Sequence, residues 1–350
     1  MGIRQRQASP SPSTAQRVLE PAGHVNMAVV EPVDLPRWLA MSGTYPLGVV
    51  SFGSPLPIPV PCPVVHLDLP QLDGPRQCEV WSSGQPIRVY RAGNFSAALS
   101  GDLMFGSISM TEVSTTALDH TTELAYRDIL RHVRTLGFPH LWRIWNYFPH
   151  INEEQHGLER YRRFCVGRHT ALAEALPDFP SSLPAGTAVG TRSGPLQIYF
   201  LAGTHSVTHL GNPRQINAYD YPETYGPRSP SFARATLYRS DIAIQLFIAG
   251  TASVVGHASQ HQGLPEVQAR ETLANLHALI DRAECVQASA DGESRSQSAF
   301  KVYIRHPEHV EAVRQALHDP LMLSSRLLVL QGDLCRKELL VEIEGLVTTD

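Results

Sequence analysis

The segment ELLVEIEG, near the end of the chain, carries carboxylates that could do acid chemistry. It spans residues 338–345 and is expected to form a strand, in which successive side chains point to opposite faces. Glu342 and Glu344 would then share one face. In a dry pocket, mutual repulsion and poor hydration raise a carboxyl pKa, so the group keeps a proton near neutral pH and can act as a general acid. If the face meets water, this is an ordinary half-buried strand, and the sequence leaves both readings open.

Arginine and tyrosine are concentrated in two segments that suit an acidic ligand. GLERYRRFCVGR (residues 157–168) brings Arg160, Arg163 and Arg168 within reach of one helix face. NPRQINAYDYPETYGPRSPSFARA (residues 212–235) has too many prolines and glycines for regular structure and is expected to form a loop. Guanidinium groups bind carboxylates through paired hydrogen bonds, which favours a small anionic ligand. The alternative for any single arginine is a solvated side chain or a weak ion pair.

A cysteine and two histidines are the other candidates for chemistry. Cys335 is followed by Arg336 and Lys337, and neighbouring cations can favour a thiolate, although a small buried hydrophobe is the alternative. His257 and His261 have a spacing that metal ligands can use, but no third ligand is apparent, so no metal site is predicted. The sequence has no P-loop, no G-x-S-x-G elbow and no redox-cofactor fingerprint, so no cofactor is predicted.

The elements that must position these groups occur twice in the chain. The first copy is expected to contain a strand at 102–110, a helix at 122–137, a strand at 140–149 and a helix from about 152 to 166. The second copy is expected to contain a strand at 242–253, a helix at 265–283, a polar surface loop at 287–298, a strand at 299–307 and a helix at 308–319. Both long helices are amphipathic, and both second strands end in proline. The repeat predicts two α+β modules, each a mixed sheet with its helices packed on one face.

The repeat also suggests where the domains divide. Residues 1–25 are rich in arginine, serine and glutamine and are expected to form a disordered tail. Residues 26–190 are assigned to the first module, which includes the covering segment PLPIPVPCPVV (residues 55–65). That segment cannot be a central strand, because each proline removes a donor from the ladder. Residues 191–350 are assigned to the second module.

Bulk composition limits the function classes. A chain of 350 residues is longer than most single cores, which agrees with two domains. A formal net charge of -4 gives no footprint for nucleic acid or an anionic membrane, and no apolar run is long enough to span a bilayer. The 5 cysteines are widely spread and lack C-x-x-C spacing, which indicates reduced thiols in a cytoplasmic protein. From the residues alone, the chain is a two-module α+β protein suited to a small anionic metabolite.

Five segments together resemble the chorismatase family. They are RIWNYFPHIN (143–152), YRRFCVGR (161–168), YGPRSPSFARA (225–235), GTASVVGH (250–257) and GDLCRKELLVEIEG (332–345). The resemblance implies hydrolysis of chorismate, with release of pyruvate and either a dihydroxycyclohexadiene carboxylate or a hydroxybenzoate. It also implies modules like those of the trimeric Rid enamine/imine deaminases, fused here into a monomer that imitates part of such a trimer.

The resemblance implies roles for individual residues. Glu342, in VEIEG, matches the family's catalytic acid, which would protonate the terminal methylene of the enol ether of chorismate. Water or the neighbouring ring hydroxyl would then capture the oxocarbenium ion. Chorismate carries two carboxylates, so at least two cationic clamps are needed. The residues expected to bind substrate are Arg163, Arg228, Arg305, Tyr147 and Tyr221.

The product and the activity leave alternatives open. Cys335 stands seven residues before Glu342, a spacing that resembles the subfamily forming 3-hydroxybenzoate, whereas Ala252 in GTAS resembles the diene-diol formers. We expect 3-hydroxybenzoate, with 4-hydroxybenzoate as a second product and the diene-diol as the alternative. A Rid-like deaminase acting on enamines and a non-catalytic module that binds aromatic acids are further alternatives. The tyrosine- and arginine-rich loop and the fused duplication count against the deaminase.

Overall fold

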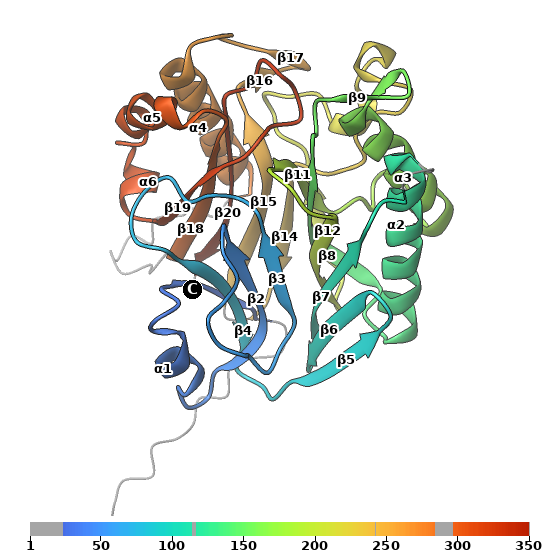
Figure 1. Cartoon of the computed structure of the whole chain (residues 1–350), viewed down its shortest axis with the longest axis vertical. Coiled ribbons are helices and arrows are strands. Elements are labelled where there is room, and N and C mark those ends of the chain that lie inside the picture. The colour runs from blue at the N-terminus through green and yellow to red at the C-terminus, as the bar shows by residue number, and fades with distance from the viewer. Residues whose placement is uncertain (1–23, 114–116, 242, 284–296, 350) are drawn as a thin grey trace, which may run out of the picture.

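Three sheets pack around a shared interior, with the longer helices on the outside (Figure 1). The structure is a computed structural model that describes residues 24–113, 117–241, 243–283 and 297–349. The expected tail up to residue 23 and most of the expected loop at 287–298 lie outside the described residues. No helix within these described ranges is long and apolar enough to cross a membrane.

The first module is a mixed sheet of six strands in the order β11-β8-β12-β7-β6-β5. Its strands are β5 (Arg88–Ala92), β6 (Phe95–Ser100), β7 (Leu103–Met110), β8 (His140–Pro149), β11 (Ala185–Thr191) and β12 (Leu196–Gly203). Helices α2 (Leu118–Thr135) and α3 (Arg160–Ala175) pack against each other and cover one face. Within this sheet β8 and β11 run parallel, and the other neighbours are antiparallel.

The second module repeats this arrangement. Its strands are β13 (Thr208–Leu210), β14 (Ala235–Arg239), β15 (Ile244–Ala252), β18 (Gln297–Ile304), β19 (Arg326–Gln331) and β20 (Val341–Thr349), in the order β13-β14-β15-β20-β18-β19. Helices α4 (Pro265–Arg282), α5 (Val310–Ala316) and α6 (Pro320–Leu323) cover its outer side. The parallel pair β18–β19 matches β8–β11, and β20 lies between β15 and β18 as β12 lies between β7 and β8. The expected α+β duplication is confirmed.

Two of the expected helices differ most from the observed ones, while α2 begins four residues before the expected position 122. The helix expected from about residue 152 begins at Arg160, because a turn and the short pair β9 (Glu154–Gln155) and β10 (Leu158–Glu159) precede it. His156 and Gly157 in that turn have positive φ angles, which a helix cannot include. The region expected as a helix at 308–319 begins with the 3-10 turn η3 (Pro307–His309) and continues as α5, which already ends at Ala316.

A smaller sheet at the N-terminal end completes the interior. It contains β1 (Asn26–Val30), β2 (Tyr45–Phe52), β3 (Val64–Leu67) and β4 (Cys78–Ser83) in the order β1-β4-β2-β3, with the short helix α1 (Leu35–Leu39). The proline-rich segment has no regular structure until Val64, where it enters the edge strand β3. β12 lies beyond residue 190, where the module boundary is expected, and it pairs with β7 and β8 of the first sheet.

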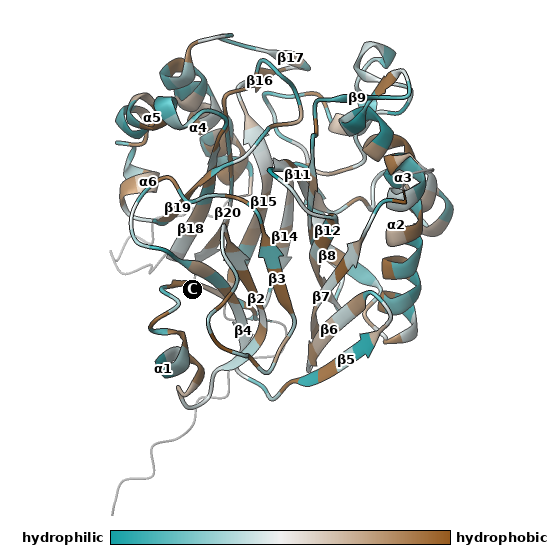
Figure 2. Cartoon of the chain, in the orientation of Figure 1, coloured by the Kyte–Doolittle hydropathy of each residue, from teal (hydrophilic) through white to brown (hydrophobic). Residues whose placement is uncertain are grey.

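The helix-free faces of the two modules are buried against each other and against the N-terminal sheet. Trp142 of the first module stacks on Tyr238 of the second, with ring centroids 4.4 Å apart. Trp81 of the N-terminal sheet lies 5.3 Å from Trp145. Figure 2 shows hydrophobic residues along the central strands and many hydrophilic residues on the peripheral helices. A strand side chain that points away from the helices therefore enters an interior shared by all three sheets.

Candidate active site

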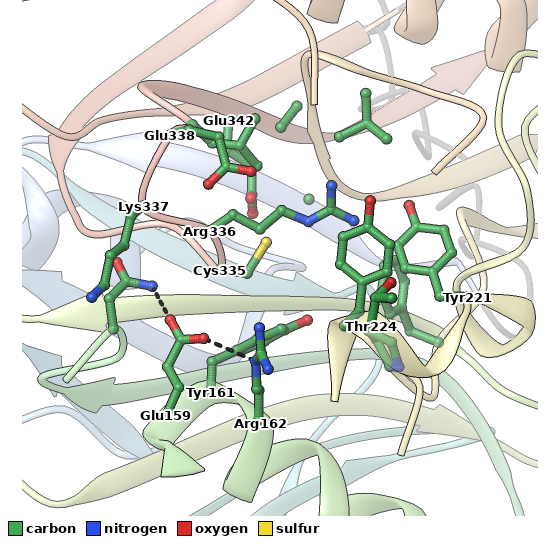
Figure 3. Close-up of a pocket in the computed structure, with 18 of the residues that line it drawn as sticks. Glu159, Tyr161, Arg162, Tyr221, Thr224, Cys335, Arg336, Lys337, Glu338 and Glu342 are labelled. Carbon is green, nitrogen blue, oxygen red and sulfur yellow. Dashed lines mark hydrogen bonds and ion pairs between the residues drawn. The ribbon is translucent and has the colours of Figure 1, made fainter. Parts of the chain in front are cut away.

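A cavity of about 680 Å³ lies between the two modules, near the start of β20 (Figure 3). The first module contributes the turn and first residues of α3, around Tyr161. The second module contributes the loop 212–234, the end of β15 and the loop 332–340. The side chains in its wall that could do chemistry include Tyr221, Tyr225, Arg234, Cys335, Arg336 and Glu342.

Glu342 brings a buried carboxyl to this cavity. Its side chain is 4% exposed, and its neighbours in the sheet are Tyr303 on β18 and Ala252 on β15. Among the residues that the structure describes, no donor forms a hydrogen bond with this carboxyl. Burial, and next the negative charge of Glu344, raise the pKa of Glu342 to about 8, although Arg143 and more weakly other arginines oppose the shift. The carboxyl therefore retains its proton at neutral pH.

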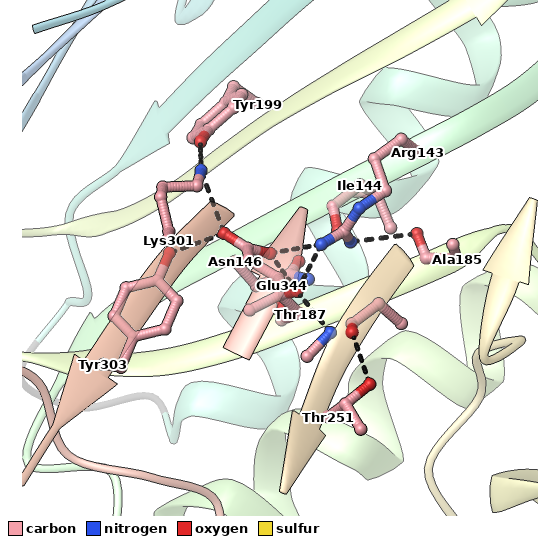
Figure 4. A network of polar contacts seen from close by, with 12 residues as sticks. Arg143, Ile144, Asn146, Ala185, Thr187, Tyr199, Thr251, Lys301, Tyr303 and Glu344 are labelled. Carbon is pink, nitrogen blue, oxygen red and sulfur yellow. Dashed lines mark hydrogen bonds and ion pairs between the residues drawn. The ribbon is translucent and has the colours of Figure 1, made fainter. Parts of the chain in front are cut away.

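Glu344 lies on the same face of β20 but has the opposite surroundings (Figure 4). One carboxylate oxygen accepts a hydrogen bond from Tyr303 at 2.6 Å and forms an ion pair with Lys301 at 2.9 Å. The other oxygen accepts from Arg143 and from the Thr187 hydroxyl. Burial alone would raise the pKa of Glu344, but Lys301 and Arg143 outweigh it and hold the pKa below its usual value. Glu344 is therefore ionised.

The sequence left open whether the strand face that carries Glu342 and Glu344 meets water. In the structure this face is turned away from bulk water. Glu344 is 1% exposed, and it contacts residues of both modules. Glu338 differs from both, because it precedes β20 and accepts a hydrogen bond from Ser259 at 2.7 Å. Of the three glutamates in the segment, Glu342 alone combines burial, access to the cavity and a proton at neutral pH.

Three arginines line the cavity. Arg162 forms an ion pair with Glu159 at 3.3 Å, whereas Arg234 and Arg336 keep donors that no described residue accepts from. Arg234 is 6% exposed; its guanidinium donates to the Tyr221 hydroxyl at 2.7 Å, and its Nε is buried without a hydrogen-bond partner among the described residues. The Arg336 guanidinium lies 4.1 Å from the ring centre of Tyr225 and donates through one nitrogen to Ser259 at 2.9 Å. Figure 3 shows Arg336 extending from the wall that carries Cys335 and Glu342 towards Tyr221.

The structure brings three of the expected site residues together and places four elsewhere. Glu342, Cys335 and Tyr221 line the cavity. The residues expected at the site that do not line it are Arg163, Arg228, Arg305 and Tyr147.

The positions of these four residues have physical reasons. Arg163 donates to the carbonyls of Gln155 and His156 and so holds the turn before α3. Arg305 donates to the carbonyls of Leu334, Arg336 and Leu339, which braces the 332–340 loop from behind. Arg228 is exposed. Tyr147 is fully buried, with its hydroxyl 2.8 Å from that of Tyr303.

Arg234 and Arg336 were not among the expected clamps. Both were visible as members of arginine- and tyrosine-rich segments, Arg234 in the loop and Arg336 beside Cys335. Which of several arginines reaches a ligand depends on how a flexible side chain is braced, and sequence spacing does not give that. The signal that could have found Arg336 is its place on the same loop as Cys335, six residues before Glu342.

Cys335 is a neutral thiol in this structure. Burial, and next the charge of Glu342, raise the pKa of Cys335 to about 12, and the opposing effect of Arg336 is smaller. The adjacent cations therefore do not produce a thiolate. Cys335 forms part of the wall next to the acid and is not set up as a nucleophile.

The two histidines with metal-like spacing have separate partners. His257 contacts the hydroxyl of Tyr225 at 3.1 Å, and His261 contacts Glu271 at 3.2 Å. Within the described part of the chain, no group of three or more histidine, cysteine, aspartate or glutamate side chains is arranged to hold a metal ion.

Known proteins are similar to this chain in sequence and in fold. Residues 79–202 match the family model described as chorismatase FkbO/Hyg5-like, N-terminal. A 3-hydroxybenzoate synthase of Streptomyces hygroscopicus is 34% identical over 316 residues, which cover 86% of this chain and 91% of that protein. A chorismatase of the same organism is 36% identical over 278 residues, which cover 77% of this chain and 78% of that protein. A chorismatase crystal structure matches with a TM-score of 0.82 and 30% identity, over 93% of this chain and 98% of that one.

These matches agree with the family resemblance of the five sequence segments and with the α+β fold. The relatives and the solved structure match both modules, whereas the family model ends within β12, the last strand of the first module's sheet along the chain. The chain belongs to the chorismatase family.

Proposed function

We propose that this enzyme cleaves the enol ether of chorismate by general-acid catalysis and releases pyruvate and 3-hydroxybenzoate. The observation that carries the proposal is the state of Glu342, a buried carboxyl with a pKa of about 8 that borders a cavity of about 680 Å³. Support for the substrate comes from relatives named chorismatase and 3-hydroxybenzoate synthase.

Glu342 supplies the proton that starts the reaction. The enol ether is electron-rich at its terminal methylene, so proton transfer from Glu342 to that carbon generates an oxocarbenium ion. If water captures this ion, the resulting hemiketal collapses to pyruvate and the diene-diol. If the neighbouring ring hydroxyl captures it, a cyclic ketal forms. Loss of the bond between that hydroxyl oxygen and the ring, together with one ring proton, makes the ring aromatic, and collapse of the remaining hemiketal releases pyruvate and 3-hydroxybenzoate. Formation of 3-hydroxybenzoate and pyruvate consumes no net water, whereas the diene-diol requires one molecule. A positioned acid of this kind contributes about 10²–10⁴-fold to the rate.

Arg234 and Arg336 are proposed as the two cationic clamps for the substrate dianion, in place of Arg163, Arg228 and Arg305. Both line the cavity, and both keep guanidinium donors that the described residues do not use. Tyr221 lies between them, with Arg234 bonded to its hydroxyl and the Arg336 guanidinium 5.3 Å from its ring centre. This arrangement holds the three side chains together before substrate binds, which lowers the entropy lost on binding.

Cys335 is proposed to shape the product and not to transfer protons. It stands in the cavity wall near Glu342 as a neutral thiol and limits the room for water beside the acid. The diene-diol remains the second candidate product, since Ala252 pairs directly with Glu342 in the sheet and is the feature that resembles the diene-diol formers.

A single chain is proposed to be sufficient for activity, because residues of one chain form the cavity wall on the sides of both modules. The sedimentation behaviour of the active enzyme tests this point. A species of one chain that turns over chorismate is the expected result.

The test of the function is incubation of purified protein with chorismate, with pyruvate measured by a coupled assay and ring products separated by chromatography. Pyruvate together with 3-hydroxybenzoate is the expected outcome. Release of ammonia from an amino-acid-derived enamine, without action on chorismate, would support the deaminase. Binding of aromatic acids with no turnover of either substrate would support a non-catalytic module.

A further inference from the structure

A chain of buried charges connects all three sheets behind the cavity, and the proposed reaction does not use it directly. Lys301 on β18 contacts Glu79 of β4 at 2.8 Å and Glu344 of β20 at 2.9 Å. Arg143 on β8 contacts the other oxygen of Glu344. All four side chains are at most 3% exposed. We call these four residues the charge network. Its two anions and two cations balance, so the buried site is neutral when Glu342 carries its proton.

The charge network ends beside Glu342. Glu342 and Glu344 are two residues apart on β20, so their side chains leave the same face of the strand. Thr187 of β11 lies at the junction: it donates to Glu344 and accepts a hydrogen bond from the Gly250 amide at 2.8 Å. Gly250 in turn lies against the Glu342 carboxyl. Glu344, whose two carboxylate oxygens both accept hydrogen bonds, and Glu342, whose carboxyl accepts none from the described residues, are thus neighbours in one buried site.

Charged and titratable groups reach Glu342 from several of the elements packed around it, including Tyr303, its pairing partner on β18, whereas β15 contributes only Gly250 and Ala252. Glu344 acts from β20 itself, and Arg143 from β8. The other groups are Arg234 before β14, Arg305 after β18 and Cys335 in the 332–340 loop. Arg143 already makes a direct ion pair with Glu344, and Arg305 with Asp333 at 2.7 Å, so much of their positive charge is compensated. The charge of Glu344 is the one that favours a protonated neighbour.

We infer that Glu344 is a positioning residue: Lys301 and Arg143 hold it as a carboxylate, and its fixed negative charge keeps Glu342 in the acid form. Glu79 completes the arrangement by balancing Lys301, which gives the N-terminal sheet a part in setting the state of the acid. The inference deepens the proposed function and rests on it for the role of Glu342 in turnover. The electrostatic relationship itself needs no substrate.

The alternative is that the charge network only holds the sheets together. Both roles predict that substitutions of Glu344 reduce activity, so loss of activity alone does not separate them. The two roles are distinguished by the pH above which Glu342 loses its proton. A purely structural role leaves that pH unchanged, whereas removal of the adjacent negative charge lowers it.

The test compares Glu344→Gln with Glu344→Asp. Both variants disturb the geometry, but the aspartate retains the charge. In Glu344→Gln, the pH at which kcat/KM falls should move down from about 8 by one unit or more, so that activity at pH 8 drops by at least about tenfold relative to pH 6. In Glu344→Asp, kcat/KM should be reduced by a similar factor at every pH, with the fall still near pH 8.

A measurement without substrate separates this inference from the proposed function. Infrared spectroscopy of the unliganded enzyme follows the carbonyl band of a protonated carboxyl, and the band lost in Glu342→Gln belongs to Glu342. That band should disappear at lower pH in Glu344→Gln than in the unmodified enzyme. An unshifted band overturns the inference, even if chorismate is the substrate. A shifted band supports it, even if chorismate is not.

A second variant keeps the test decisive if Glu344→Gln does not fold. Glu344→Gln combined with Lys301→Met removes one charge of each sign and leaves Glu79 and Arg143 to balance. The Glu342 band should again titrate at lower pH. Titration as in the unmodified enzyme would show that Glu344 does not set the state of the acid.

Discussion

Gly250 lies directly against the carboxyl of Glu342, so that a Cβ atom at position 250 would overlap Oε1 of the glutamate. Gly250 belongs to β15 and is not among the glycines with positive φ, so its backbone could accept another residue. What requires glycine here is the space occupied by the acid. The close approach fixes the carboxyl between β15 and the cavity.

The substitution Gly250→Ala is expected to displace Glu342 and lower the rate of pyruvate release from chorismate by roughly 10- to 100-fold, as small misplacements of a catalytic group can do. The measurement is kcat with purified, folded protein, with circular dichroism as the control for folding. A rate within twofold of the unmodified enzyme would mean that the position of Glu342 tolerates movement.

Glu342→Gln is expected to lower pyruvate release by about 10²–10⁴-fold, because the amide cannot donate a proton to the methylene carbon. Binding of an unreactive aromatic dicarboxylate, measured by calorimetry, should change only a few-fold. Glu338→Gln is the matched control and should retain activity within a few-fold. If Glu338→Gln loses turnover and Glu342→Gln keeps it, Glu342 is not the general acid.

The same substitution should change how stability depends on pH. The pKa of Glu342 is raised to about 8 in the folded state, so between its unfolded pKa and pH 8 the folded protein binds the extra proton. Stability of the unmodified protein therefore falls with rising pH over this range, by roughly 1.4 kcal/mol per unit from this group, and Glu342→Gln removes that loss. The measurement is the free energy of unfolding in urea at pH 5 and pH 8. Relative to the unmodified protein, the variant should be more stable at pH 8 than it is at pH 5. An equal difference at both pH values would place the Glu342 pKa outside this window.

Arg234→Met and Arg336→Met are each expected to raise KM for chorismate by roughly 10- to 100-fold, the loss expected for a hydrogen bond to a charged group. Arg228→Met is the matched control, since that exposed arginine does not line the cavity, and its KM should stay within twofold. An increase in KM for Arg228→Met that equals the other two would restore it as a clamp.

Cys335→Ala is expected to shift the products from 3-hydroxybenzoate towards the diene-diol, because a smaller side chain admits water beside the acid. Pyruvate release should stay within a few-fold, since the neutral thiol transfers no proton. Chromatography of the ring products gives the ratio, and Cys62→Ala, a buried thiol of the N-terminal sheet region, is the control. An unchanged ratio would remove Cys335 from product control.

The sequence by itself determined the duplicated α+β modules and the carboxylates on one strand face. Both follow from periodicity, since the helices repeat apolar residues every three or four positions and strand side chains alternate. The VEIEG segment therefore placed Glu342 and Glu344 together before any fold was known. The resemblance of this segment to the chorismatase family then assigned the role of catalytic acid to Glu342 and not to Glu344.

Only the tertiary structure decided which groups surround those carboxylates. Glu79, Arg143 and Lys301 lie far apart in the chain, and they meet Glu344 only because three sheets bury their helix-free faces together. Which arginines border the cavity was likewise decided by the folded loops, which brace Arg305 away from the cavity and leave Arg336 in its wall. Long side chains reach many places, and a buried charge is stable only where its partners converge. Sequence spacing encodes local periodicity, whereas that convergence exists only in the folded chain.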